Sequence, residues 1–368
     1  MEQCGLKKMK VLVAGLTNNR GGTEAVINRY ALALSEYATF DYLCQEDVDY
    51  ACTSMPDSNI YVMPVRRNNP LKYYRASGTF FAKKAQEYDI FWMNTNNLAN
   101  LAPLNFAYRY GIKKRIVHVH SSRFLAKGIG LFQSELHRKA ILRKATDLYA
   151  CSKEAGTFYF GSGLFHVVPN AFDLESFRFS EEKRAAIRKE LGVEGRHVIG
   201  TVGRLADQKN QKMLIGLMPE ILERNPRAVL VLIGEGIMRD ELAHKVKELD
   251  LEGKVLLPGS RDDVVSALSA FDVFALPSLS EGLGIAAIEA QANGLPCVIS
   301  DGVPESVVLT KTTQRIALED RDGWIGALVC DEPRQPFESA RKNLREFDIS
   351  LQIERFRTLF FSGVGGDK

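Results

Sequence analysis

The chain lacks any stretch long enough to cross a membrane and any cysteine pattern typical of a metal site. Its densest apolar run covers residues 228–233, whereas a membrane-spanning helix needs about 18 or more apolar residues. The six cysteines include no Cys-x-x-Cys pair, so neither a zinc cluster nor a disulfide framework is predicted. Only a short apolar run follows the lysines near the N-terminus, too short for a secretion signal. We therefore expect a cytoplasmic protein with reduced cysteines.

A strong excess of one charge is also missing. The sequence has 48 lysines and arginines against 45 aspartates and glutamates, a formal net charge of +3. This balance does not indicate the excess of positive charge that is typical of nucleic-acid-binding proteins. At 368 residues, with 45% hydrophobic and 25% charged content, the chain is long enough for two globular domains.

Strand-like apolar runs alternate with helix-like segments in both halves of the chain. The strands are expected at residues 11–16, 40–44, 60–64, 90–93, 115–120, 148–151 and 166–168, then at 198–203, 228–234, 255–257, 273–276 and 296–300. This alternation predicts α/β domains built on parallel sheets. We expect a first domain at 1–174, a second at 175–345 and a C-terminal segment at 346–368, with residues 171–181 acting as a linker.

The segment 271–301 is the most informative part of the sequence. An apolar run at 273–276 predicts a buried strand, Gly282 to Gly284 predict a loop, and residues 285–293 predict a helix. A strand, a glycine loop and a helix N-terminus together favour an anion site, because exposed backbone amides and the helix dipole attract negative charge.

Two glutamates flank this loop. Glu281 precedes it, and Glu289 lies about one and a half helical turns beyond Gly284, roughly 7 to 8 Å along the axis. That distance suits a pyrophosphate and its ribose. Taken alone, Glu289 would be interpreted as a solvated helix carboxylate. The segment from Gly282 to Ala287 also matches the dinucleotide fingerprint GxGxxA, with Asp301 as the acidic residue, which would indicate an NAD-dependent oxidoreductase.

SEGLGIAAIEA (residues 280–290) resembles the E-x7-E signature of the family 4 retaining nucleotide-sugar glycosyltransferases. Leu283 stands where phenylalanine is commoner in that family. Other segments agree in the expected order: TNNRGGTE at 17–24, HVH at 118–120, VPNAFD at 168–173, VGRL at 202–205 followed by Lys209, LIGEG at 232–236 and LPG at 257–259. Ala171 replaces a usual glycine. The resemblance covers about residues 9–310.

The resemblance implies the GT-B architecture, in which two Rossmann-like α/β domains face each other across a cleft and the last helix, expected at 351–361, crosses back to the first domain. It also implies a retaining glycosyltransferase. Such an enzyme would move a sugar from a nucleotide sugar, expected to be UDP-linked, to a glycan or lipid-linked glycan acceptor in surface or exopolysaccharide synthesis.

The resemblance also assigns roles to individual residues. His120, Glu281, Arg204 and Lys209 would be catalytic, with the two cations neutralising the departing diphosphate. Without the neighbouring motifs, Arg204 and Lys209 would be interpreted as solvated surface cations. The donor-binding set is Gly21, Gly22, Arg204, Lys209, Gly234, Gly259, Ser260, Arg261, Glu281, Gly282, Leu283, Gly284, Ile285 and Glu289.

No metal and no cofactor are expected. His118 and His120 alternate along a strand and could share a metal, but no acidic or cysteine cluster supplies further ligands. Asp47-Val48-Asp49 resembles the metal-binding DxD of another glycosyltransferase fold, although its acidic loop is best interpreted as solvated.

Basic clusters in the first half are a further feature. They are Arg66-Arg67, Lys113-Lys114-Arg115 and Arg138-Lys139 with Arg143-Lys144. Together they predict peripheral contact with the anionic inner face of the cell membrane. Two other functions stay open from the sequence: a nucleotide-sugar epimerase of the same fold, and a noncatalytic scaffold that would be expected to have lost Glu281, Arg204 or Lys209.

Overall fold

The computed structural model describes residues 8–16, 22–45, 58–96, 98, 100–121 and 129–364, with backbone alone for 129–136. The chain divides into two compact units, Met1–Phe172 with Ile349–Lys368, and Asp173–Asp348. The sequence predicts these two boundaries after residues 174 and 345. The predicted loop carrying Asp47 and Asp49 lies outside the described residues.

The first unit is built on a parallel sheet. Its strand order is β3-β2-β1-β4-β5-β6-β7. The strands are β1 (Met9–Ala14), β2 (Ala38–Cys44), β3 (Ile60–Val62), β4 (Ile90–Thr95), β5 (Lys114–Val119), β6 (Asp147–Ala150) and β7 (His166–Val167). The apolar residues of β1 and β4 are buried on both faces, which is why these strands appear in the sequence as continuous apolar runs.

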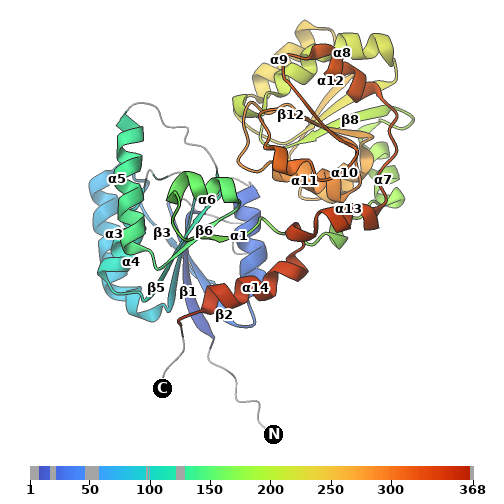
Figure 1. The fold of residues 1–368 in the computed structure, drawn as a ribbon. Helices are drawn as coiled ribbons and strands as arrows, with labels where there is room; N and C mark the ends of the chain where they lie inside the picture. Colours follow the sequence, from blue (N-terminus) through green and yellow to red (C-terminus); the bar gives the residue numbers. More distant parts are fainter. Residues whose placement is uncertain are drawn as a thin grey trace. The chain divides into compact units, whose positions relative to one another are not determined.

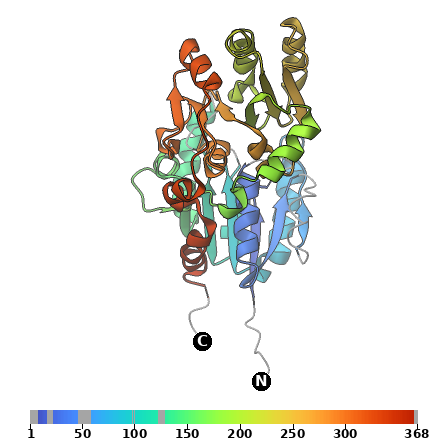
Figure 2. The same ribbon diagram turned by 90° about the vertical axis from the view of Figure 1, so that its right-hand side faces the viewer.

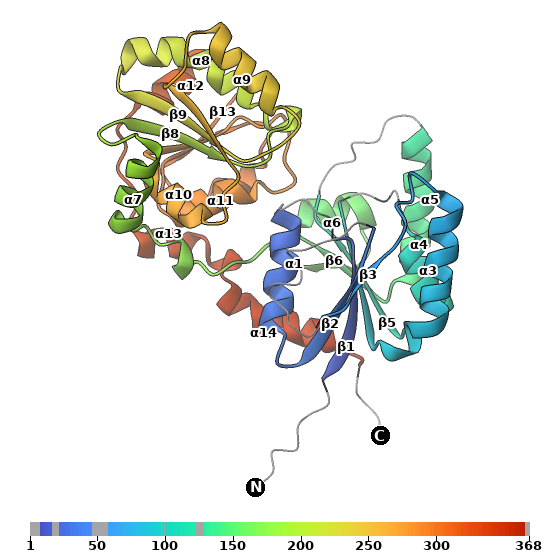
Figure 3. The same cartoon turned by 180° about the vertical axis from the view of Figure 1, so that it is seen from behind.

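Helices cover both faces of this sheet (Figures 1 and 3). On one face lie α3 (Pro70–Lys84), α4 (Ala102–Arg109), α5 (Ile129–Lys144) and α6 (Lys153–Phe160); on the other lie α1 (Gly22–Ala33) and α14 (Ile349–Phe361). Alternate residues of a strand point to opposite faces. Phe91 and Met93 of β4 therefore join the core below α3 to α6, whereas Trp92 points to α14.

The last helix packs on the first unit, as predicted (Figure 2). The Phe356 ring lies 4.2 Å from the Tyr30 ring and 5.9 Å from the Trp92 ring, measured between centroids. Lys114 Nζ donates to the carbonyl oxygens of Leu359 and Ser362 at 2.8 and 2.7 Å. These contacts attach the end of the chain to β4 and β5.

The expectation that Lys113-Lys114-Arg115 forms an open basic surface is therefore wrong for its last two members. Lys114 is buried and pairs with Asp147 at 3.3 Å. Arg115 donates to the carbonyl oxygens of Lys113 and Lys144. Both side chains stabilise the first unit, because their N–H groups donate to backbone carbonyl oxygens.

The second unit repeats the architecture. Its parallel sheet has the order β10-β9-β8-β11-β12-β13, formed by β8 (His197–Val202), β9 (Ala228–Ile233), β10 (Val255–Gly259), β11 (Val273–Leu276), β12 (Cys297–Ser300) and β13 (Thr313–Ile316). One face packs on α8 (Gln211–Arg224), α9 (Arg239–Glu248) and α12 (Arg321–Val329); the other packs on α7 (Glu181–Leu191), α10 (Val264–Ala270) and α11 (Ile285–Ala292). The short α13 (Phe337–Asn343) follows α12.

The predicted fold class, two Rossmann-like α/β domains with parallel sheets, is confirmed. The sequence predicts helices at residues 23–37, 73–87, 101–110, 131–144, 211–224, 238–249, 261–270, 285–293 and 351–361. It misses β13, α6, α7, α12 and α13. β13 has two exposed side chains in four residues, and α7 is rich in charged residues, so neither carries a clear apolar pattern. Within the described residues, no helix is long and apolar enough to span a membrane.

Candidate functional site

The strand order of the second sheet reverses between β8 and β11. From β8 the chain proceeds to β9 on one side, whereas β11 is followed by β12 on the other. At such a switch point the loops at the carboxyl ends of the two strands diverge and leave a crevice for ligands. The loop after β8 carries Arg204 and Lys209, and the loop after β11 carries Glu281. The fold thus brings Arg204, Lys209 and Glu281 to one edge of one sheet.

Lys209 and Glu281 are in direct contact at this edge. Lys209 Nζ lies 2.6 Å from Glu281 Oε1. The hydroxyl of Ser278 donates to the same oxygen, also at 2.6 Å. Glu281 is 9% exposed and Ser278 is fully buried. Hydrogen bonds to a charged group are about twice as strong as neutral ones, so both contacts fix the carboxylate in place.

The two loops are also joined through their backbones. Leu279 N donates to Gln208 O at 2.8 Å, and Gln208 Nε2 donates to Ser280 O at 2.6 Å. On the other side, Glu281 N donates to Gly302 O at 2.9 Å. The segment that carries Glu281 is therefore held by both neighbouring loops.

The glycine loop ends in a left-handed residue that opens α11. Gly284 has φ 74° and ψ 48° and is the N-cap of the helix. A side chain would be strained in this conformation, which explains the glycine. Its carbonyl accepts from Ala287 N, while Ile285 at the first helical position is partly exposed. Because the first amides of a helix have no partner within it, this end presents positive charge. Glu289 lies half-buried on the same helix.

Arg204 and the predicted glycines line the neighbouring strand ends. Arg204 is exposed, and its carbonyl accepts from Gln211 Nε2 at 3.0 Å. Gly234 has φ +145°, and a Cβ there would lie 1.9 Å from Gly203 O. Its N–H donates to Gly259 O at 2.9 Å. This close approach of backbones at the ends of β8, β9 and β10 requires glycine.

Arg261 is placed differently from the other predicted donor-binding residues. Its guanidinium pairs with Glu190 at 2.5 Å and with Asp263 at 2.9 Å. These two carboxylates raise its pKa. Ser260 beside it is exposed. The structure therefore shows Arg261 holding α7 to the segment before α10.

His120 directly follows β5 in the first unit. Its Nε2 lies 2.9 Å from Asn94 Oδ1, and burial lowers its pKa to about 4, so the ring is neutral at pH 7. His118 is fully buried, 4.1 Å from the His120 ring centroid and stacked on Trp92. Burial, and then the neighbouring His120, keep the pKa of His118 well below its usual value. Gly22 is the first residue of α1, and Gly21 lies outside the described residues.

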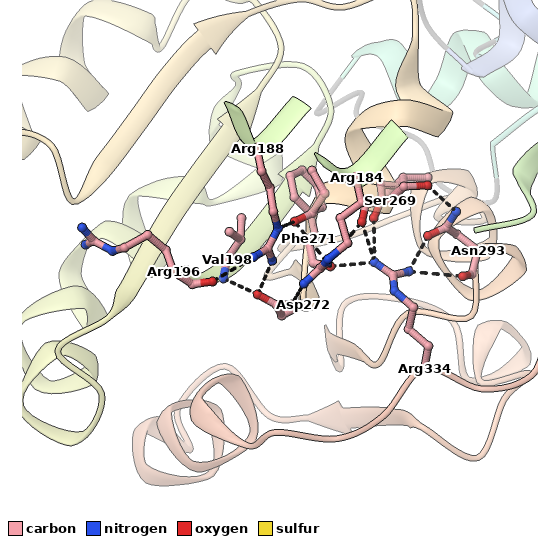
Figure 4. Close-up of polar contacts among 11 residues, drawn as sticks. Arg184, Arg188, Arg196, Val198, Ser269, Phe271, Asp272, Asn293 and Arg334 are labelled. Atoms are coloured by element: carbon pink, nitrogen blue, oxygen red, sulfur yellow. Dashed lines mark hydrogen bonds and ion pairs between the residues drawn. The ribbon is translucent and has the colours of Figure 1, made fainter. Parts of the chain in front are cut away.

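Three arginines hold the start of β11 and the end of α11, at the ends away from the Glu281 loop (Figure 4). Asp272, just before β11, pairs with Arg184 and Arg188 at 2.5 Å each and accepts from Val198 N at 2.7 Å. Arg334 donates to Phe271 O at 2.6 Å and to the Asn293 side-chain oxygen at 2.5 Å. Sequence analysis missed these residues because their partners are distant in the chain. It also assigned no role to Ser278 or Gln208.

These sites define the class of protein. Solved structures with the same fold include Anabaena HepE in complex with UDP and glucose (TM-score 0.79, 19% identity, covering 96% of this chain and 100% of that one). Another is sucrose-phosphate synthase from Thermosynechococcus elongatus (TM-score 0.76, 18% identity, covering 96% and 98%). The fold is that of the GT-B glycosyltransferases.

Sequence comparison gives the family. The family model described as "Glycosyl transferases group 1" matches residues 183–322. The putative glycosyltransferase EpsF of Bacillus subtilis (strain 168) is 32% identical over 324 residues, 82% of this chain and 81% of that protein. The Escherichia coli UDP-Gal:alpha-D-GlcNAc-diphosphoundecaprenol alpha-1,3-galactosyltransferase is 31% identical over 255 residues, 66% of this chain and 65% of that protein.

The chain belongs to the group 1 glycosyltransferase family. It is a transferase that moves a sugar from a nucleotide-sugar donor, and the predicted family resemblance is confirmed. The comparisons support neither the epimerase nor the oxidoreductase alternative.

The arginine network predicts acid-sensitive stability. Burial alone would raise the pKa of Asp272, but the Val198 amide and the two guanidinium groups outweigh burial and lower it. A carboxyl whose pKa is lower in the folded state stabilises the fold above its unfolded pKa of about 3.9, and this contribution is lost as the pH falls through the folded value. We expect Asp272→Ala to reduce the free energy of unfolding at pH 7 by roughly 3 kcal/mol, because it leaves buried guanidinium groups unpaired.

Denaturant unfolding at pH 7 and pH 3 measures this effect. The difference between wild type and Asp272→Ala should shrink at pH 3. Asp322→Ala is the control, since Asp322 pairs with Arg224 on the surface with its side chain 88% exposed and should cost less than about 1 kcal/mol. Equal costs for the two variants would show that the network contributes no special stability.

Proposed function

We propose that the protein is a retaining glycosyltransferase that uses a UDP-linked sugar and acts on a lipid-linked glycan in surface or exopolysaccharide synthesis. The contact between Lys209 and Glu281 at the switch point carries this proposal. It places a cation for the diphosphate next to a carboxylate for sugar hydroxyls. The UDP donor and the lipid-linked acceptor are supported by the HepE complexes with UDP and by the name of the Escherichia coli relative.

Each group has a defined part in the proposed reaction. Breaking the bond from sugar to phosphate leaves negative charge on the diphosphate, which Arg204, Lys209 and the amides at the start of α11 would neutralise. Glu281 would accept hydrogen bonds from the sugar and Glu289 from the ribose. His120, neutral at pH 7, would contact the sugar, as the family resemblance implies. Retention by front-face displacement needs no enzymic nucleophile, because the acceptor hydroxyl would itself bond to the anomeric carbon on the face from which the diphosphate leaves. The departing phosphate can take the acceptor's proton.

The donor can be tested by calorimetry with UDP and GDP. A relative from Mycolicibacterium smegmatis, 30% identical over 259 residues, is named as GDP-mannose-dependent, so GDP is the informative competitor. We expect binding of UDP and not of GDP. Incubation with a UDP-sugar alone separates transfer from epimerisation, since an epimerase would interconvert the sugar without acceptor. Tight binding of GDP alone would overturn the UDP assignment.

The two glutamates should respond differently in the same measurement. Glu289→Ala removes a charge-assisted hydrogen bond to ribose, worth roughly 1.5 to 3 kcal/mol, and should weaken UDP binding at least about tenfold. Glu281→Ala should not weaken UDP binding, because it releases Lys209 from its ion pair and leaves the ribose contact intact. Equal UDP affinity in wild type and Glu289→Ala would contradict the assigned roles.

We also propose that catalysis needs no divalent metal. The Lys209 ammonium has three N–H donors, so it can keep Glu281 and still reach a diphosphate. Two charge-assisted contacts of roughly 1.5 to 3 kcal/mol each supply about 3 to 6 kcal/mol, or about two to four decades in rate.

Activity should therefore persist in excess chelator. Arg204→Ala and Lys209→Ala should each lose at least about a hundredfold in turnover, and the double variant less than the product, because both cations act on one diphosphate. Loss of activity in chelator with recovery in magnesium or manganese, combined with a nearly unimpaired Arg204→Ala, would disprove the mechanism.

The membrane contact is proposed at the start of α3. Residues 58–86 contain no aspartate or glutamate. Arg67, Lys72 and Arg75 are exposed there beside Leu71 and Tyr74, whose side chains are 85% and 45% exposed. Exposed cations interleaved with apolar side chains fit an anionic lipid surface. The cluster at Arg138 fits less well, because that guanidinium donates to the carbonyls of neighbouring α6.

Sedimentation with vesicles of anionic and of neutral lipid tests this surface. Binding to anionic vesicles should weaken as rising salt shortens the Debye length, and replacing Arg67, Lys72 and Arg75 with serine should abolish it. The matched control replaces three exposed lysines of the second unit, Lys183, Lys189 and Lys247, with the same loss of charge. Equal loss in both variants, or binding that survives high salt, would rule out the α3 surface.

A further inference from the structure

Ser278 occupies a position that the assigned catalytic residues do not explain. It is the second residue after β11 and is fully buried. Its hydroxyl donates to Glu281 Oε1 at 2.6 Å, the same oxygen that receives Lys209 Nζ. Both donors therefore reach one oxygen of the carboxylate, and neither contact uses Oε2. A carboxylate held in this way presents its second oxygen in a fixed direction.

The two donors differ in how firmly they can hold the carboxylate. Lys209 has a long side chain with an ammonium that the donor diphosphate would also attract. Ser278 has a single side-chain torsion, and its backbone is fixed, since its carbonyl accepts from Ser300 Oγ at 2.5 Å. The serine hydroxyl thus remains hydrogen-bonded to Glu281 when a diphosphate attracts the Lys209 ammonium.

The geometry points to Ser278 as a positioning residue for sugar transfer, which orients the Glu281 carboxylate toward the donor sugar. This inference rests on the proposed role of Glu281. The backbone of the loop is held by other contacts, from Gln208 and Gly302. Loss of the Ser278 hydroxyl should therefore act on the carboxylate and leave the loop in place.

A double-mutant cycle between Ser278→Ala and Glu281→Ala tests the inference. The probes are UDP and three nucleotide sugars, UDP-glucose, UDP-galactose and UDP-N-acetylglucosamine. Affinity is measured by calorimetry. Turnover is measured as release of UDP from the nucleotide sugar that wild type binds most tightly, with water as the acceptor of the sugar. Ser278→Ala should lower turnover about tenfold to a hundredfold, the equivalent of one charge-assisted hydrogen bond, with UDP affinity unchanged.

In the Glu281→Ala background, Ser278→Ala should have no further effect on turnover, because the group it positions is gone. Ser278→Thr, which keeps a hydroxyl, should recover part of the loss. Ser269→Ala is the matched control: Ser269 is equally buried in the same unit, and its hydroxyl donates to Val265 O within α10. Thermal unfolding of each variant shows whether it folds.

The outcomes distinguish failure of the Ser278 positioning role from failure of the proposed function. If wild type turns over and the losses from Ser278→Ala and Glu281→Ala multiply independently, the positioning role alone is overturned. A Ser278→Ala variant as active as Ser269→Ala would also overturn it. If wild type binds UDP but Glu281→Ala turns over normally, the proposed role of Glu281 fails first. If wild type binds none of the nucleotide sugars, the proposed UDP-dependent function fails.

Discussion

The contact between the Lys209 ammonium and the Glu281 carboxylate depends on one feature of the fold, the pairing of β8 with β11. The two residues are 72 positions apart, and they meet because their strands are neighbours where the strand order reverses. If either strand paired elsewhere in the sheet, the loops that carry Lys209 and Glu281 would lie apart. The site is therefore a consequence of topology before it is a consequence of side-chain chemistry.

The same contact pairs the negative charge of the Glu281 carboxylate with the positive charge of the Lys209 ammonium. Removing a carboxylate from water is costly unless it is paired and hydrogen-bonded, and Glu281 has both an ammonium and a hydroxyl on one oxygen. In the proposed function, the donor diphosphate brings new negative charge to Lys209. In the proposed function Arg204, exposed and nearby in sequence, supplies the additional positive charge, so that the lysine can serve both anions.

Sequence patterns could predict the fold and could name Arg204, Lys209 and Glu281, which the structure brings to the switch point, because the relevant signals are local. The alternation of apolar runs predicted two parallel sheets, and the glycine loop before α11 predicted the helix start at Gly284. Lys114 could not be interpreted correctly, since its partners Asp147, Leu359 and Ser362 are distant in the chain. The ion pair of Arg261 with Glu190 could not be predicted for the same reason, because the two residues meet only in the folded unit.

Ser278 shows a different limit of sequence reasoning. It stands three residues before Glu281, so the pair is local, yet nothing in the sequence says that the loop turns its hydroxyl onto the carboxylate. That orientation comes from the contacts that hold the loop on both sides. A helix of only eight residues is too short to be stable by itself. Arg334 holds its last residues through Asn293, and the loops from Gln208 and Gly302 hold the segment before its first. Because both ends are fixed, the separation of Glu281 from Glu289 is fixed as well, which the proposed contacts with a sugar and a ribose of one nucleotide require.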